Sequence, residues 1–291
     1  MNISKKHHYL PEFYLKGFTN DADKLFIYDK SRDVIKKGEY SPSTHFFGFN
    51  RNSVEIDGKL DDFPEEMYSK IDDIDKGIIQ FIQSQNSVFS LDSYQIFQLQ
   101  LFISNFIWRN PQFDEKYRKA IIENESRKNF FRIRNVEDGS DAPKEIVDEI
   151  KKSDGFIKSF RSSYGILKWM TNKTKYDHEK WRISYNPKHY VLVSDNPMIK
   201  LSKEIDFFED NFIFPLSKKF TLIRSLTELT ARQLPPEFTL LVDVIIVQQA
   251  EYYAACSNKE HLEQIVGLSK SMNLDYAKNK IFEILKNSTN S

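Results

Sequence analysis

This sequence has one cysteine, nine glycines and a formal net charge of zero. Cys256 is the single cysteine in 291 residues, which excludes an internal disulfide framework and a cysteine-based zinc site. Lys+Arg and Asp+Glu both number 42, so the chain lacks the overall positive field that draws proteins to nucleic acid non-specifically. Any recognition of nucleic acid must therefore use a local basic site.

Long hydrophobic runs are absent as well. The most apolar stretches, 99–108 and 240–247, are shorter than the roughly 20 residues that cross a bilayer. The residues after Met1 are polar and then aromatic, without the apolar core of a secretory signal. We therefore expect a cytoplasmic protein that does not insert into a membrane.

The familiar catalytic motifs are also missing. The chain has no glycine-rich phosphate loop, no HExxH and no GxSxG, and only nine glycines in all. It does contain 40% hydrophobic residues, with 24 phenylalanines, which is enough for a substantial core. A reaction would have to come from side chains that the fold brings together.

The first part of the chain predicts short elements. Residues 10–17 favour a short helix, because Pro11 suits its first turn and Gly17 its end. The segments 24–30 and 33–40 flank Ser31-Arg32 and indicate a β-hairpin. A turn-like aromatic segment follows, and 52–58 favours one more short strand.

Longer helices are expected next. The spacing of apolar residues predicts helices over 64–84 and 90–111, the second with Ser90 as its N-cap. Residues 112–135 suggest an exposed continuation of that helix. The segment 137–143 is typical of a loop, and helical periodicity returns over 143–175.

Strand-like sequence then gives way to helices again. Short segments rich in β-branched and aromatic residues predict a small sheet over 181–225. The segment 234–257 indicates one long helix, followed by about two shorter ones. The expected fold is α+β: a single domain over 1–291, with a small mixed or antiparallel sheet formed by the N-terminal hairpin and the central strands. A helical section (about 62–175) and C-terminal helices (about 235–287) would pack with it.

Three groups of polar residues lie in apolar settings and are candidates for a site. The first is HHYLPEFY, where His8 and Glu12 are four residues apart and would face the same way if the turn begins early. Histidine is the side chain best suited to proton transfer near neutral pH. The alternative is that His7 and His8 only anchor the start of the chain.

The second group is on the apolar helix LQLFISNFIWRNP. Gln98, Asn105 and Arg109 fall within about 40° of one another on a helix. A narrow polar stripe on a buried helix needs buried partners or a ligand, because unpaired buried polar groups are costly. Arg109 could bind a carboxylate or a phosphate with two parallel hydrogen bonds, or it could pair structurally with an acidic residue.

The third group is the end of the strand HYVLVSDNP. Ser194, Asp195 and Asn196 follow its apolar residues. Asp195 could act as a general base, a metal ligand or the carboxylate that orients a histidine. Ordinary turn chemistry before Pro197 explains the same residues. His8 and Asp195 are the side chains that a metal would use, but no ligand spacing indicates one, so cofactors are left open.

Together and in this order, these stretches resemble an uncharacterised bacterial family, the domain of unknown function 4238 family. Its members begin with a motif like HHYLPEFYLKGF and continue with a strand like LFIYDK, an Arg-x-Pro step, a strand ending in Ser-Asp-x-Pro and a segment like FPLS. The resemblance covers roughly residues 5–257. The matching positions are His8, Pro11, Phe13, Leu15, Phe18, Arg109, Pro111, Ser194, Asp195 and Pro197. The resemblance implies no established reaction, but such families are scattered among bacterial accessory genes, where toxins and phage-defence effectors are common.

The preferred hypothesis is a nuclease-like enzyme that acts on phosphodiesters of nucleic acid or a nucleotide. His8, Arg109, Asp195 and Glu12 would be catalytic, and the neighbouring polar residues would contact the substrate: His7, Gln98, Asn105, Ser194 and Asn196. The alternative is an interaction or sensor module in which the His/Arg/Asp cluster is structural. Function would then lie on a surface such as FFGFN (46–50), and the partner would be another protein or a second copy of the chain.

Overall fold

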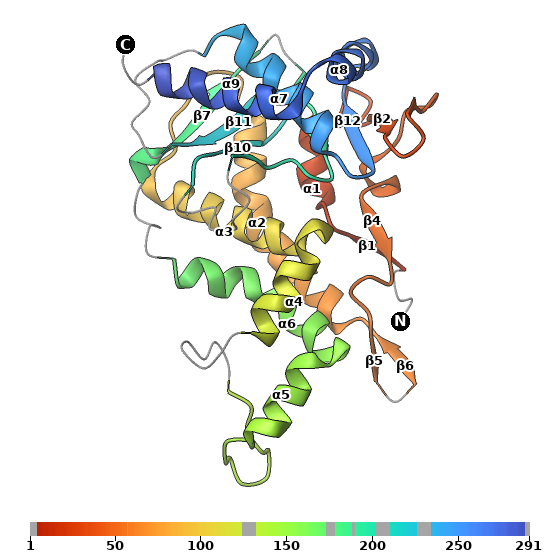
Figure 1. Ribbon diagram of the computed structural model, residues 1–291, viewed down its shortest axis with the longest axis vertical. Helices are drawn as coiled ribbons and strands as arrows, with labels where there is room; N and C mark the ends of the chain where they lie inside the picture. Colours follow the sequence, from red (N-terminus) through yellow and green to blue (C-terminus); the bar gives the residue numbers. More distant parts are fainter. Residues whose placement is uncertain are drawn as a thin grey trace. The chain divides into compact units, whose positions relative to one another are not determined.

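The computed structural model describes residues 5–56, 58–123, 132–172, 178–187, 190–201, 210–225 and 234–288. The fold is α+β, as predicted, with helices and small antiparallel sheets (Figure 1). Contacts divide the chain into two compact units. Unit 1 comprises Met1–Tyr9, Phe47–Ile74 and Gln100–Thr171, and unit 2 comprises Leu10–Phe46, Asp75–Leu99 and Asn172–Ser291. That the chain is a single domain stays a prediction.

Unit 1 contains two small ribbons of antiparallel strands. β1 (Lys6–His8) pairs with β4 (Phe47–Phe49), and β5 (Val54–Ile56) pairs with β6 (Lys59–Asp61). The strand expected over 52–58 is confirmed. The two histidines, however, form a strand and not the first part of a turn, because their backbone pairs with residues distant in sequence.

The helices of unit 1 follow the predicted order. α2 (Phe63–Ser84) and α3 (Ser93–Arg109) each contribute residues to both units, and α4 (Asp114–Ile122) follows a 3-10 turn (Pro111–Phe113). The expected continuation of α3 over 112–135 is wrong in two places: α4 is a separate helix, and residues 132–135 are not helical, with Arg134 bridging to Asp141. Residues 124–131 of that segment lie outside the described ones.

α5 (Lys144–Lys152) and α6 (Asp154–Met170) complete unit 1. They divide the predicted segment 143–175 because Ser153 caps the second helix. The loop expected over 137–143 is confirmed by its turn, in which the backbone N–H of Gly139 donates to the carbonyl of Asn135.

The N-cap of α3 differs from the prediction. The backbone N–H of Gln95 donates to Asp92 Oδ1 at 2.8 Å, and Gln95 Oε1 accepts from the N–H of Asp92 at 3.0 Å. This reciprocal arrangement is a capping box. Asp92 therefore takes the role expected of Ser90, because a carboxylate with a glutamine three residues later satisfies two backbone donors at once.

Unit 2 contains a four-stranded sheet that joins distant segments. Its order is β3 (Val34–Ile35), β2 (Phe26–Asp29), β12 (Tyr253–Cys256) and β8 (Val193–Ser194), all antiparallel. The predicted N-terminal hairpin is thus confirmed as β2–β3. Its link to the central strands is made through β12.

β12 corrects the prediction of one long helix over 234–257. α7 (Pro236–Gln249) ends eight residues earlier, and the chain turns into an extended strand. Periodicity could not reveal this end, because the backbone after Gln249 is held by Asp195 and by β2, both far away in sequence.

A second sheet of unit 2 comes from the segment 181–225, as predicted. Its order is β7 (Trp181–Tyr185), β11 (Phe220–Arg224), β10 (Phe212–Pro215) and β9 (Ile199–Lys200), again antiparallel. The short helix expected near the N-terminus is α1 (Glu12–Leu15) with a 3-10 turn (Lys16–Phe18). Further 3-10 turns cover Pro42–Thr44 and His178–Lys180. The two shorter C-terminal helices are α8 (Lys259–Ser271) and α9 (Leu274–Asn287).

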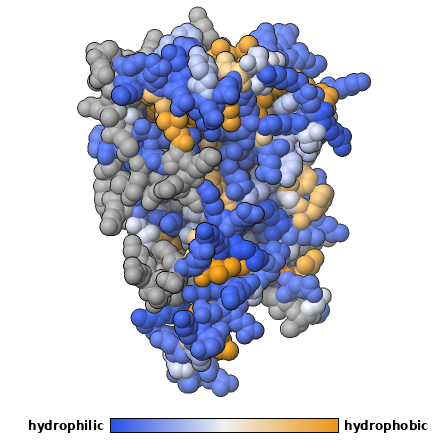
Figure 2. All heavy atoms as spheres, in the orientation of Figure 1, coloured by the Kyte–Doolittle hydropathy of each residue, from blue (hydrophilic) through white to orange (hydrophobic). Residues whose placement is uncertain are grey.

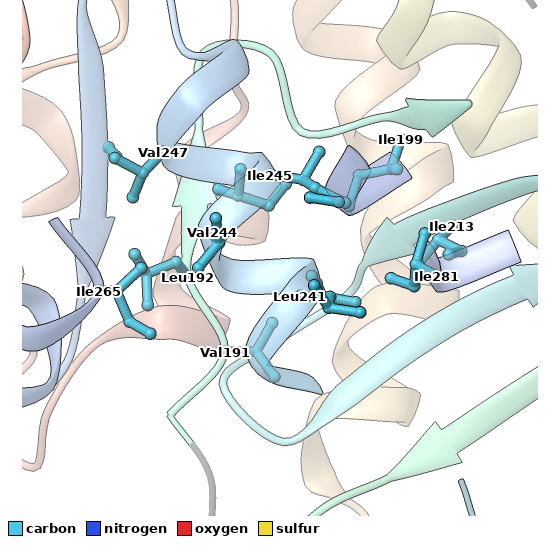
Figure 3. Close-up of a cluster of buried hydrophobic side chains, with 14 of the residues drawn as sticks. Val191, Leu192, Ile199, Ile213, Leu241, Val244, Ile245, Val247, Ile265 and Ile281 are labelled. Carbon is cyan, nitrogen blue, oxygen red and sulfur yellow. The ribbon is translucent and has the colours of Figure 1, made fainter. Parts of the chain in front are cut away.

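The core of unit 2 is built around α7. Figure 3 shows Leu241 and Val244 of this helix among other buried side chains. These include Leu192 just before β8, Ile265 of α8 and Ile281 of α9. α7 is apolar nearly all round, which is typical of a buried helix. On the face drawn in Figure 2, hydrophobic residues lie in separate groups among hydrophilic ones.

Candidate functional site

Arg109 lies at the last position of α3 in unit 1 and is 6% exposed. Its Nη1 donates to Asp72 Oδ1 at 2.6 Å, and its guanidinium carbon lies 4.7 Å from the ring centre of Tyr68. Tyr68 and Asp72 are four residues apart on α2, so one face of that helix presents both. The charge of Arg109 is thus paired with one carboxylate and stacked on one aromatic ring.

Two further arginines bind the end of the same helix. Arg161 of α6 donates from Nε to the carbonyl of Trp108 at 2.6 Å and from Nη2 to that of Asn110 at 3.0 Å. Arg51 donates to the carbonyl of Arg109 at 3.4 Å. These guanidiniums satisfy carbonyls that the end of a helix leaves without partners.

Asp114 at the start of α4 joins the two arginines. Its carboxylate accepts from Nη1 and Nη2 of Arg51 at 2.8 and 2.6 Å, and it also accepts from Nη2 of Arg161. We call the set Arg51, Tyr68, Asp72, Arg109, Asp114 and Arg161 the arginine cluster.

The electrostatics of the arginine cluster follow from burial and charge. Burial raises the pKa of Tyr68, although Arg161, Arg109 and Arg51 all favour its ionised form, so the phenol keeps its proton. Burial also raises the pKa of Asp72 against the effect of Arg109. Burial acts the same way on Asp114, but the hydrogen bonds and charges of Arg51 and Arg161 outweigh it and lower the pKa.

Two donors of the arginine cluster lack an acceptor among the described residues. They are Tyr68 Oη and Arg109 Nε, both buried. Buried donors are rarely left this way in proteins, because each costs free energy when it is not hydrogen-bonded. The arginine cluster thus lacks hydrogen-bond acceptors for these two donors, and an anion could supply them.

The two histidines of the opening motif have separate environments in unit 1. His7 is fully buried; its Nδ1 accepts the backbone N–H of Asn52 at 2.9 Å, and its Nε2 lies 3.9 Å from Asp62 Oδ1. His8 is half-buried, and its ring centre lies 5.5 Å from that of Phe47 in an edge-to-face arrangement. His8 is in a strand and Glu12 in α1 of unit 2, so the two residues do not share one helical turn.

Asp195 binds the backbone of residues 251–253. In unit 2, its Oδ1 accepts the N–H of Glu251 at 2.7 Å, and its Oδ2 accepts those of Tyr252 and Tyr253 at 2.6 and 2.8 Å. Burial raises the pKa of Asp195, while these hydrogen bonds act in the opposite direction. The carboxylate fixes the chain between α7 and β12.

The neighbours of Asp195 strengthen this connection. Asn196 Nδ2 donates to the carbonyl of Gln249 at 3.1 Å, and Gln249 Nε2 donates back to that of Asn196 at 2.5 Å. Ser194 is buried, and its Oγ accepts the N–H of Asn196 at 3.2 Å. These residues make the turn that the sequence offered as the alternative to a catalytic site.

The structure divides the remaining predicted site residues between the units. Asn105 is in unit 1, where a Cβ on Gly165 would lie 2.7 Å from its Oδ1, so it packs at a close crossing of α3 and α6. Gln98 and Glu12 are both in unit 2, where Gln98 is half-buried and Glu12 is exposed. His8 and Arg109 belong to unit 1 and Asp195 to unit 2, so their convergence on one site stays a prediction.

Sequence reasoning missed most of the arginine cluster. The sequence did not single out Arg51, Tyr68, Asp72, Asp114 or Arg161, although Tyr68 and Asp72 have helical i,i+4 spacing within the predicted helix 64–84. That spacing was the one available signal. The two other arginines are brought in by tertiary contacts.

A second polar group, around His45 in unit 2, was also missed. Lys36 Nζ donates to His45 Nε2 at 2.8 Å and lies 3.9 Å from Asp29 Oδ2. Thr44 Oγ1 donates to the carbonyl of Ser41, so His45 Nδ1–H donates to Thr44 Oγ1 at 2.9 Å. The imidazole is therefore neutral and held at both nitrogens, as in a structural group.

The part of the chain that the structure describes contains neither a candidate metal-binding group nor a candidate membrane-spanning helix. No group of three His, Cys, Asp or Glu side chains there could hold a metal ion. Likewise, none of the helices described has the length and apolar character needed to span a membrane.

Comparison with known proteins gives a family and no function. The model of the family described as "Protein of unknown function (DUF4238)" matches residues 6–260. This confirms the resemblance seen in HHYLPEFYLKGF, Arg-x-Pro and Ser-Asp-x-Pro. No curated protein and no solved structure matches the chain.

Proposed function

The chain belongs to the DUF4238 family, whose function is unknown, and we propose that it is a nuclease-like bacterial effector that holds a phosphodiester at its arginine cluster. The observation that carries the proposal is the pair of buried donors without acceptors, Tyr68 Oη and Arg109 Nε. A phosphate supplies only acceptor oxygens and a negative charge. It therefore matches what the cluster lacks in both hydrogen bonding and charge.

The chemistry of the donors supports the same substrate class. A guanidinium is always charged, and its planar set of N–H donors fits two oxygens of a phosphate. A phenol that burial keeps protonated is a neutral donor to an oxyanion. Arg109 and Tyr68 would thus bind the phosphate and stabilise the charge that develops on its oxygens.

The two carboxylates of the arginine cluster are partly exposed to solvent. The side chains of Asp72 and Asp114 are 27% and 42% exposed, whereas that of Arg109 is 6% exposed. Asp72 holds one nitrogen of Arg109 and leaves Nε. A ligand that reached these carboxylates would meet an arginine already oriented by an acidic neighbour.

The second candidate is a non-catalytic interaction module. It is favoured by the bonds of Arg51 and Arg161 to the carbonyls that end α3, since such bonds stabilise a helix whether or not a ligand is present. The role of Arg109 and Tyr68 separates the two candidates.

Replacing Tyr68 by Phe tests the proposal. The change removes a hydroxyl that has no partner among the described residues, so the free energy of unfolding should stay within about 0.5 kcal/mol of wild type. Cleavage of single- and double-stranded DNA and RNA by the purified protein should fall at least about tenfold. Expression in a bacterial host, scored by growth and by RNA and DNA integrity, measures the same loss in cells.

Tyr117→Phe is the matched control. Tyr117 Oη donates to the carbonyl of Ile157 at 2.7 Å, so its removal should cost about 1 kcal/mol of stability and leave cleavage unchanged. If Tyr68→Phe leaves every activity of the wild type intact, the cluster is structural and the interaction module is the better reading.

A further inference from the structure

The ribbon of β1 and β4 has one face composed of aromatic and basic side chains. Its register pairs Lys6 with Phe49 and His8 with Phe47. Cross-strand partners share a face of a sheet, and alternate residues along a strand do so too. We call these four residues, Lys6, His8, Phe47 and Phe49, the outer face of the ribbon.

The other face of the ribbon is packed against unit 1. His7 and Gly48 pair there, and His7 is fully buried. A Cβ on Gly48 would lie 3.2 Å from the Cβ of Arg51, so this side has no free space. The outer face is consequently the side of the ribbon on which a ligand could bind.

The rings of the outer face contact one another, and that of Phe49 is exposed while Phe47 and His8 are half-buried. The ring centres of Phe47 and Phe49 are 5.2 Å apart at 84°, and Lys6 Nζ lies 4.8 Å from the ring centre of Phe47. Phe49 is 69% exposed. An ammonium beside exposed aromatic rings is the combination that single-stranded nucleic acid uses, with bases on the rings and phosphates at the charge.

We propose that the outer face of the ribbon binds single-stranded nucleic acid by stacking bases on Phe49 and Phe47, with Lys6 contacting the backbone. This inference rests on the proposed function and names its substrate class. Charge complementarity supports this occupant, since the exposed Lys6 places a positive charge beside the aromatic rings. A duplex is a poorer fit, because its bases stack on each other and hide their faces.

The ribbon is also linked by sequence to the arginine cluster. Arg51 lies two residues after Phe49, packs beneath Gly48 with its side-chain stem and reaches Asp114 with its guanidinium. A nucleic-acid strand whose bases stack on the outer face would therefore contact residues that are close in sequence to Arg51, which belongs to the proposed phosphate site. The two sites would contact the same polymer through different chemical groups.

The test compares Phe49→Ser with Tyr94→Ser. Tyr94 is the control because it is 68% exposed, much like Phe49, but belongs to unit 2. The probes are fluorescently labelled oligo(dT) and oligo(U) 20-mers and one DNA duplex of the same length, followed by anisotropy. Phe49→Ser should weaken binding of the single strands about tenfold, and Tyr94→Ser should leave it unchanged. The melting temperature of both variants should match that of wild type.

The outcomes separate this inference from the proposed function. If Phe49→Ser binds single strands as wild type does, or if wild type prefers the duplex, the stacking face is wrong. If Tyr68→Phe loses cleavage while Phe49→Ser keeps full binding, the phosphate site stands and the stacking face falls. If Phe49→Ser loses binding while Tyr68→Phe keeps full cleavage, the stacking face stands without the phosphate site.

Discussion

Asp195 and Arg109 are both buried charged residues at the end of an apolar element, but their surroundings differ. In unit 2, Asp195 accepts three backbone N–H groups within 2.6 to 2.8 Å. In unit 1, Arg109 has one carboxylate partner, and its Nε has none among the described residues. The first residue has its hydrogen bonds filled by the fold, and the second does not.

This difference teaches how the two units use buried polarity. In unit 2, Lys30 also binds main chain, donating to the carbonyls of Gln248 and Ala250, although Lys36 and His45 bind each other through side chains. Polar side chains of the arginine cluster bind mainly one another at an edge that reaches solvent. A filled set of partners indicates a structural role, whereas missing acceptors leave capacity for a ligand.

Asp195→Ala should give the largest effect. It leaves three buried backbone donors without an acceptor, so the free energy of unfolding should fall by about 3–5 kcal/mol, measured by urea denaturation. Activity per folded molecule should be unchanged. A variant that unfolds like wild type but has lost activity would make Asp195 catalytic, as the sequence first suggested, and would break the comparison.

Asp114→Asn should have a smaller effect that depends on pH. Since its pKa is lowered in the folded protein, the stability that the Asp114 carboxylate contributes is present above about pH 4 and is lost as the pH falls through the folded value. The variant should lose about 1 kcal/mol at neutral pH, with allowance for solvent exposure, and less in acid. Urea midpoints between pH 3 and 7 measure this.

Asp72→Asn is the opposing control for that series. The pKa of Asp72 is raised by burial, so its contribution is present below about pH 4 and is lost as the pH rises through the folded value. Asp72→Asn should therefore change the pH dependence of the free energy of unfolding in the direction opposite to that of Asp114→Asn. Equal changes in both variants would mean that the two carboxylates do not differ as described.

Glu12→Gln should have the smallest effect. Glu12 is exposed on α1 of unit 2 and does not share a helical turn with His8. We expect a change in stability within about 0.5 kcal/mol and unaltered cleavage. A loss of cleavage as large as that of Tyr68→Phe would restore Glu12 to the catalytic set that the sequence predicted.

The fold was predictable where the signal is local. The helix over 64–84 and the hairpin after Lys24 depend on periodicity and on turn residues, and both are present. β1 and β12 were not predictable, because each is a strand only through a partner far along the chain. The N-cap of α3 was misplaced because Ser90 and Asp92 are both good capping residues, and only the reciprocal bond with Gln95 decides between them.

The candidate site was predictable in its residue types but not in its membership. Arg109 was singled out by its position on an apolar helix, and its buried setting confirms that it needed partners there. Those partners, Tyr68 and Asp72, come from another helix, and no pattern within α3 could identify them. Asp195 was singled out as well, but its environment depends on the N–H groups of 251–253, which sequence spacing does not show.

The pairing of β2 with β12 sets a limit on when this protein can fold during its synthesis. Phe26 and its partner Cys256 are separated by 230 positions in the sequence, so Phe26 leaves the ribosome long before Cys256. At about 5–20 residues per second, the early hairpin waits on the order of ten seconds or more before its neighbour strand exists. The sheet that contains β2 can therefore close only after β12 has been synthesised, and a product truncated before β12 would lack the strand between β2 and β8.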